Sequence, residues 1–135
     1  MHIQLYVQKV DQYQDCKQIQ LNQLNSLPPA SCSLIHIGNC LDFVPNRELV
    51  FTEICKKLKY GGRIIVEGTD LAETMFAYHT GVLLEKDLIP ILFTGRYSCT
   101  TLNHIYTMCK DIGLTIIQSR LDQYIYSVVG ERHNV

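Results

Sequence analysis

Apolar and polar positions alternate at the start of the chain, where Ile3, Leu5 and Val7 are separated by Gln4 and Tyr6. A period of two residues is typical of a strand that buries one face. We therefore predict a strand over residues 2–10. A second alternating segment predicts another short strand over residues 18–24, which ends before a pair of prolines.

The next part of the chain has the pattern of two strands joined by a helix. A compact apolar strand is predicted over residues 33–37, and Asn46 is placed to cap a helix that ends at Gly61-Gly62. A further buried strand is predicted over residues 63–67. This order indicates a βαβ unit with parallel strands. The residues expected in its core are Ile35, Ile37, Val50, Ile54, Leu58, Ile64, Ile65 and Val66.

Three helices and a hairpin complete the predicted fold. Two helices span residues 71–79 and 83–93, and residues 98–101 can cap a further helix that ends near Asp111. The hairpin pairs residues 114–118 with residues 124–129. We predict one α/β domain over residues 1–135. Its sheet has five or six strands and is mainly parallel, with an antiparallel hairpin at the C-terminal edge.

Composition excludes several classes of protein. Among 135 residues, 12 basic and 13 acidic side chains give a net charge of -1. The protein therefore lacks the positive electrostatic field that nucleic-acid binding requires. No apolar run is long enough to cross a membrane, and the first residues do not resemble a secretory signal, so a cytoplasmic protein is expected. The six scattered cysteines favour buried free thiols over disulfides or a zinc site.

Motifs for hydrolysis or metal catalysis are absent from the sequence. It contains no GxSxG, no HExxH and no paired carboxylates, so we predict no catalytic residue and no metal ligand. His36 lies inside a predicted buried strand. It is interpreted as a core histidine, with a role as a base as the alternative.

Two segments carry a resemblance to a known family. The first is LPPASCSLIHIGNCLDFVP, from Leu27 to Pro45, and the second is LKYGGRIIV, from Leu58 to Val66. Together they resemble the central part of class I S-adenosylmethionine-dependent methyltransferases. In that family an LPxxSxDxI motif leads into the fourth strand and a VLEHVP motif opens the next helix. An LKPGGxLxI motif then ends the helix and leads into the fifth strand. The resemblance implies a Rossmann-like sheet and S-adenosylmethionine as the cofactor.

The sequence departs from this family where the cofactor should bind. Family members have a glycine-rich turn after the first strand and an acidic residue at the end of the second. Here no glycine precedes Gly38, and the residues at the second position are Asn22 and Gln23. The first helix is also missing from the pattern, so the fold is reduced in size. We predict that the turn over residues 7–11 does not hold the cofactor.

Candidate site residues follow the two central strands. Gly38 and Asn39 come after one strand, and the loop Glu67, Gly68, Thr69 and Asp70 comes after the next, at the sheet edge where Rossmann-like folds bind ligands. These six residues are the predicted cofactor-binding set. The alternatives are a tight turn at Gly38-Asn39 and a helix cap at Thr69 or Asp70. The loop over residues 94–98 could hold an anion through Arg96 or be a solvated connection.

Three functions remain open from the sequence. The leading hypothesis is a degenerate methyltransferase-like protein, a pseudoenzyme that needs no cofactor and acts through protein contacts as a homo-oligomer or with another protein. The first alternative is a minimal active methyltransferase in which Gly38, Asn39 and the loop over residues 67–70 hold S-adenosylmethionine. The second is a protein that binds another small ligand in the vacated cleft. The missing glycines favour the first hypothesis.

Overall fold

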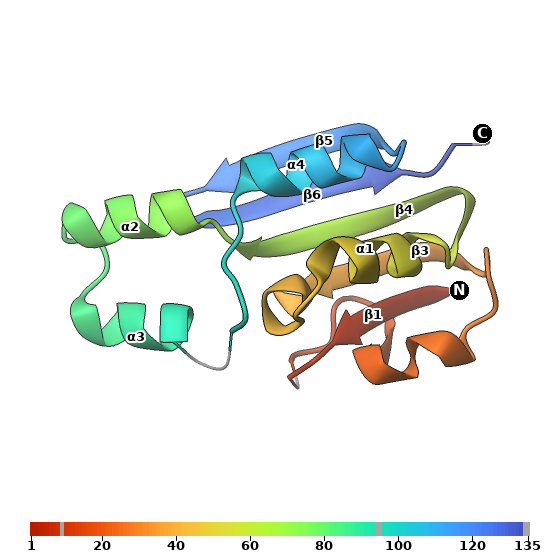
Figure 1. The fold of residues 1–135 in the computed structure, drawn as a ribbon, viewed down its shortest axis with the longest axis horizontal. Coiled ribbons are helices and arrows are strands. Elements are labelled where there is room, and N and C mark those ends of the chain that lie inside the picture. The colour runs from red at the N-terminus through yellow and green to blue at the C-terminus, as the bar shows by residue number, and fades with distance from the viewer. Residues whose placement is uncertain (9, 94–95, 134–135) are drawn as a thin grey trace.

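The computed structural model describes residues 1–8, 10–93 and 96–133. The described residues form one six-stranded sheet with the strand order β2-β1-β3-β4-β6-β5, together with four α-helices (Figure 1). The strands are β1 His2–Tyr6, β2 Lys17–Gln20, β3 Cys32–Gly38, β4 Leu58–Thr69, β5 Thr115–Asp122 and β6 Ile125–Glu131. The helices are α1 Arg47–Cys55, α2 Leu71–His79, α3 Glu85–Phe93 and α4 Leu102–Asp111, with short 3-10 helices at Leu21–Ser26 and Cys40–Phe43.

The direction of the strands confirms the predicted α/β class. Strands β2, β1, β3 and β4 are parallel to one another, whereas β6 pairs antiparallel with both β4 and β5. Strands β3 and β4 with α1 form the predicted βαβ unit. The last two strands form the predicted hairpin. The sheet is therefore mainly parallel with an antiparallel C-terminal edge.

The hydrophobic core lies on one face of this sheet. Leu5, Ile37, Val66 and Val128 occupy neighbouring positions across four strands, and all four are buried. Helices α1 and α4 lie in front of the sheet in Figure 1 and add to the same cluster. The helical residues in the cluster are Phe51, Ile54, Cys55, Ile105, Met108 and Cys109. This arrangement positions the carboxyl ends of β1, β3 and β4 at one edge.

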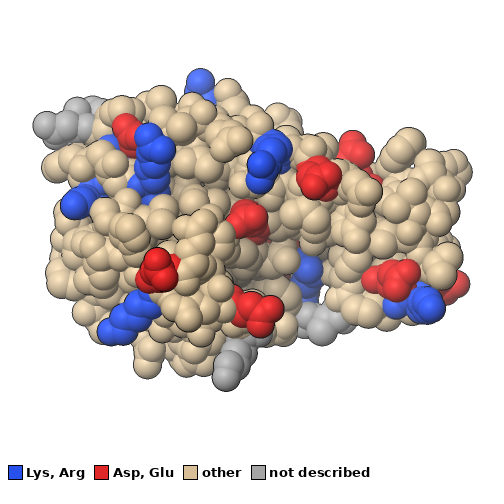
Figure 2. All heavy atoms as spheres, turned by 180° about the vertical axis from the view of Figure 1, so that it is seen from behind, with Lys and Arg blue, Asp and Glu red and all other residues tan. Residues whose placement is uncertain are grey.

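The opposite face of the sheet has no helix among the described residues, and Figure 2 views the molecule from this side. Leu34, Ile65 and Val129 lie here and are only partly buried. Ile65 was expected in the core, but alternation along β4 directs Ile64 and Val66 to the core and Ile65 away from it. Parallel sheets are ordinarily covered on both faces. We call this surface the open face.

The two glycines that were predicted to end a helix lie within a strand. Helix α1 ends at Cys55, and β4 begins at Leu58, which is fully buried beside Cys32. A Cβ on Gly62 would lie 2.8 Å from the Lys59 carbonyl oxygen and 2.9 Å from the Cys32 carbonyl oxygen. Gly61 has a φ of +80°. These glycines therefore permit the irregular pairing at the start of β4.

Several other element boundaries differ from the predictions. Strand β1 ends at Tyr6 rather than at residue 10, and β2 ends at Gln20. Residues 21–26 form a 3-10 helix because Leu24 and Leu27, three residues apart, turn into the core. Helix α3 begins at Glu85 instead of residue 83. Helix α4 begins at Leu102, directly after the predicted cap segment over residues 98–101.

Side-chain caps explain where three of the helices begin. The Asn46 side chain accepts a hydrogen bond from the Leu49 N–H at 3.2 Å, as predicted for α1. Asp70 caps α2 in the same way, and Thr101 caps α4 by accepting from the His104 N–H at 3.2 Å. Each cap satisfies a donor that the first helical turn leaves free.

Two composition-based expectations concern the cysteines and the helices. All six cysteines are free thiols, and five of them are buried, which confirms the prediction for the cysteines. In the described part of the chain, no helix combines the length and apolar character that crossing a membrane requires.

The one-sided core predicts an asymmetry between neighbouring residues of β4. Ile64→Ala should lower the free energy of unfolding by about 2 to 5 kcal/mol because it leaves a cavity in the core. Ile65→Ala should lower the free energy of unfolding clearly less, because Ile65 is already partly exposed. Denaturant unfolding measures both changes. Equal losses, or a loss below about 1 kcal/mol for Ile64→Ala, would contradict the assignment of the two faces.

Candidate functional site

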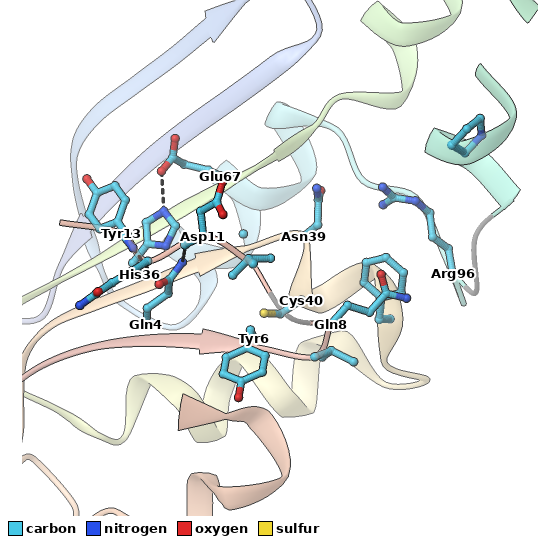
Figure 3. Close-up of a pocket in the computed structure, with 16 residues that line it drawn as sticks. Gln4, Tyr6, Gln8, Asp11, Tyr13, His36, Asn39, Cys40, Glu67 and Arg96 are labelled. Atoms are coloured by element: carbon cyan, nitrogen blue, oxygen red, sulfur yellow. Dashed lines mark hydrogen bonds and ion pairs between the residues drawn. The ribbon is translucent and has the colours of Figure 1, made fainter. Parts of the chain in front are cut away.

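A cavity of about 670 Å³ lies at the carboxyl ends of β1, β3 and β4 (Figure 3). Side chains from these strands and from the segment between β1 and β2 line it, and Pro90 and Arg96 contribute from beyond α2. Open α/β sheets bind their ligands at this edge. The position of the cavity is therefore the one that the sequence predicted for the site.

The structure brings only part of the predicted set to this cavity. Gly38, Asn39 and Glu67 line it, whereas Gly68, Thr69 and Asp70 are not among the lining residues. Whether the first three hold a cofactor stays a prediction. The remaining three have contacts within the fold that account for their positions.

Asn39 connects the ends of the two central strands. Its backbone N–H donates to the Glu67 carbonyl oxygen at 2.9 Å, and its Oδ1 accepts from the Thr69 N–H at 3.1 Å. It has a φ of +44°, which asparagine tolerates better than most residues. Gly68 packs against this contact, since a Cβ there would lie 2.8 Å from Asn39 Oδ1 and 2.6 Å from the Tyr126 hydroxyl. This part of the predicted site is a structural junction.

Asp70 also has a structural role. One carboxylate oxygen accepts from the Glu73 N–H at 2.9 Å, and the other accepts from the Leu102 N–H at 2.7 Å. The carboxylate thereby caps α2 and holds the start of α4 beside it. The capping alternative for Asp70 is confirmed.

His36 and Glu67 form the most closely associated pair in the cavity wall. His36 Nε2 lies 2.5 Å from Glu67 Oε1, and the Tyr13 ring stacks on the imidazole with centroids 3.8 Å apart. The hydrogen bond with His36 lowers the pKa of Glu67, and the charge of Arg120 adds a smaller lowering. The His36 side chain is only 8% exposed, and its Nδ1 has no hydrogen-bond partner among the described residues. His36 is thus both a buried histidine and part of the cavity wall.

The Gln4 side chain holds the segment between β1 and β2 against the sheet through hydrogen bonds. Its Oε1 accepts from the Tyr13 N–H at 2.8 Å, and its Nε2 donates to the Asp11 carbonyl oxygen at 3.0 Å. Gln18 on β2 donates to the same Oε1 at 3.3 Å. These bonds bring Asp11 and Tyr13 to the cavity. Neither residue was predicted from the sequence as part of the site, and the polar side chain of Gln4 within a strand was the available signal.

The turn after β1 has the composition that the sequence predicted to be unsuited to the cofactor. Val7, Gln8 and Val10 all line the cavity. Lys9 is outside the described residues. At the end of β2, Gln20, Leu21 and Asn22 line a separate cavity of about 300 Å³ whose described walls contain no carboxylate. The family's usual ribose acceptor has no equivalent at that position.

Arg96 lies in the cavity wall, but its charge is already paired. It forms a buried ion pair with Asp42 and lies over the Phe43 ring, 5.1 Å from the centroid. Burial raises the pKa of Asp42, and the charge of Arg96 opposes that effect. Residues 94 and 95 of the proposed anion loop are outside the described residues. For Arg96 itself, the ion pair weakens the case for an anion site.

Several solved structures similar to this chain are described as methyltransferases. S-adenosylmethionine-dependent methyltransferases of Thermotoga maritima and Methanosarcina mazei give TM-scores of 0.63 and 0.64, each at 14% identity. The matches cover 87% and 90% of this chain, and 64% and 69% of those chains. This chain thus spans less than two thirds of the Thermotoga protein. The likenesses show a methyltransferase-like Rossmann fold, which confirms the predicted fold class.

A third similar structure contains two proteins. It is a complex between the Trm112 methyltransferase activator of Haloferax volcanii and a presumed methyltransferase, with a TM-score of 0.61 at 11% identity. The match covers 92% of this chain and 65% of that chain. No protein-family model matches the sequence, and no curated protein matches it either.

The role of Asn39 as a junction predicts a loss of stability when its side chain is removed. Asn39→Ala should lower the free energy of unfolding by about 1 to 3 kcal/mol, because it removes the acceptor for Thr69 and leaves alanine with a positive φ. Asn39→Gly keeps the backbone unstrained and should cost less. Thermal or denaturant unfolding distinguishes them. If neither Asn39→Ala nor Asn39→Gly changed the free energy of unfolding, the junction would not contribute to stability.

Proposed function

We propose that this chain is a methyltransferase-like domain that does not transfer methyl groups and acts through contacts with another protein chain. The observation that carries the proposal is the wall of the cavity after β1, where Val7, Gln8 and Val10 replace a glycine-rich turn. A backbone with side chains at these positions cannot approach a cofactor as closely as glycines allow.

The contacts of the other predicted site residues support the same conclusion. Asn39, Gly68 and Asp70 serve the junction of the strands and the caps of the helices. Glu67 uses one carboxylate oxygen, Oε1, for a hydrogen bond with His36. Structural roles therefore account for the positions of Asn39, Gly68 and Asp70 without a cofactor.

Two exposed apolar surfaces support a role in protein contacts. The first is the open face, with Leu34, Ile65 and Val129 partly exposed. The second is the α2–α3 region, which projects from the end of the sheet in Figure 1. Its exposed apolar residues are Met75, Phe76, Tyr78, Val82, Leu84 and Ile89. Large apolar patches mark interaction surfaces, and a second copy of the chain is the simplest partner.

One observation favours the alternative of an active methyltransferase. The Asp11 carboxylate, which reaches the cavity from the segment between β1 and β2, could accept hydrogen bonds from the ribose hydroxyls in place of the missing acid at the end of β2. Binding of S-adenosylmethionine therefore decides between the two functions.

The proposed function predicts no stabilisation by S-adenosylmethionine or by its demethylated product. A ligand present at 100 times its dissociation constant raises the free energy of unfolding by about 2.7 kcal/mol, which appears as a clear shift of the melting temperature. We expect no shift at millimolar ligand, measured by differential scanning fluorimetry and by calorimetric titration. Binding at micromolar strength would contradict the proposal and support the active enzyme.

The open face predicts self-association that a charge on this face would weaken. Wild-type protein should sediment partly as a dimer at high micromolar concentration, and Val129→Lys should shift it toward the monomer, because Val129 lies on the open face. Leu49→Lys is the matched control, since Leu49 is 57% exposed on α1, away from that face. A monomer at every concentration, or equal effects of the two variants, would contradict a dimer formed through the open face.

A further inference from the structure

The charged side chains that line the large cavity leave it with a negative balance. Among the described lining residues, Asp11 and Glu67 are acidic and Arg96 is basic. Arg96 forms its ion pair with the buried Asp42, so its positive charge is compensated within the wall. Figure 2 shows a hollow on this side of the molecule, with both acidic and basic side chains at its rim. The described part of the lining therefore favours a cation over an anion.

The two carboxylates retain unused capacity to accept hydrogen bonds. Asp11 is exposed, and no other described residue forms a hydrogen bond or ion pair with its carboxylate. Glu67 uses Oε1 for His36, and Oε2 has no partner among the described residues. In Figure 3 both residues reach the same cavity, Glu67 from β4 and Asp11 from the segment after β1.

His36 provides an independent indication that a hydrogen-bond partner is missing at the cavity wall. Its Nε2 lies against a carboxylate, which only accepts, so this nitrogen carries the proton. The Nδ1 of this nine-tenths buried side chain has no hydrogen-bond partner among the described residues. In a neutral imidazole this nitrogen accepts, and there a ligand N–H would supply the missing partner.

The remaining walls fit the organic part of a cation. Tyr6, Phe43 and Tyr13 contribute aromatic rings, and Val7 and Val10 contribute aliphatic surface. Ammonium groups are attracted to aromatic faces as well as to carboxylates. The Arg96 guanidinium over the Phe43 ring shows that this lining already accommodates one cation.

We propose that the cavity binds a small organic amine in its ammonium form, with Asp11 and Glu67 as the groups that recognise its charge. The inference goes beyond the proposed function, because it assigns a ligand to the cavity whether or not the chain associates with a partner. It involves no chemical step and no cofactor.

The test uses a matched pair of probes with opposite charge. Isothermal titration calorimetry at pH 7 and low salt compares 1,4-diaminobutane with succinate, which have four-carbon chains and two charges each. The diamine should bind saturably with one site per chain, and succinate should give no saturable heat. Binding should weaken as salt is added, because the recognition is electrostatic.

Two variants identify the group responsible. Asp11→Asn should weaken diamine binding about tenfold or more, the effect expected for loss of a charged hydrogen-bond acceptor. Asp15→Asn is the control, since Asp15 is an exposed acid in the same segment that does not line the cavity. Circular dichroism and melting temperature verify that both variants fold, which the lack of described contacts to the Asp11 carboxylate predicts.

Each other outcome overturns the inference. Binding of succinate in place of the diamine would assign the cavity to an anion held by Arg96. Equal losses in Asp11→Asn and Asp15→Asn would show non-specific attraction to the acidic surface. Diamine affinity weaker than about 10 mM would show that the cavity holds no such ligand. None of these results depends on whether S-adenosylmethionine binds, so failure here is distinguishable from failure of the proposed function.

Discussion

The fold depends on the burial of one row of alternating apolar residues across the parallel strands. Leu5, Ile37 and Val66 are neighbours in register, and each is almost fully buried beneath α1 and α4. A shift of one residue in any of these strands would turn its apolar side chains to the other face. This constraint holds β1, β3 and β4 in register, and it brings their carboxyl ends together at the cavity.

The same alternation determines the chemistry of the opposite face. Gln4 and His36 are opposite one another in the sheet, pointing away from the core. Buried polar groups require partners, and here they obtain them from Tyr13, Asp11 and Glu67. These hydrogen bonds hold the segment between β1 and β2 against the sheet. In class I methyltransferases the corresponding segment begins with a glycine-rich turn. The polar residues on this face thus connect the fold directly to the candidate site.

Much of the architecture could be predicted from the sequence because its signals are local. The βαβ unit, the hairpin and the caps at Asn46 and Asp70 follow from periodicity and from side chains that bond to nearby backbone. Gly61 and Gly62 were misassigned because a glycine that ends a helix and a glycine that permits irregular strand pairing look alike in sequence. Only the contact between Gly62 and Cys32, 30 positions earlier in the chain, distinguishes them.

The candidate site was less predictable for the same reason. Gly38, Asn39 and Glu67 were found because strand ends meet at one edge of a parallel sheet. Asp11 and Tyr13 reach the cavity through hydrogen bonds to Gln4, and Arg96 reaches it through an ion pair with Asp42. These contacts join residues that are distant in sequence or lie in segments without regular structure. No periodic pattern in the sequence therefore predicts these contacts.

We propose that this methyltransferase-like fold has a turn after β1 that does not admit the cofactor. The most direct measurement is a two-dimensional amide NMR spectrum recorded with and without millimolar S-adenosylmethionine. The account predicts that the amide signals of Gln8, Gly38 and Asn39, which line the cavity, do not move. Saturable shifts of these three signals would place the cofactor at the carboxyl edge of the sheet and contradict the account.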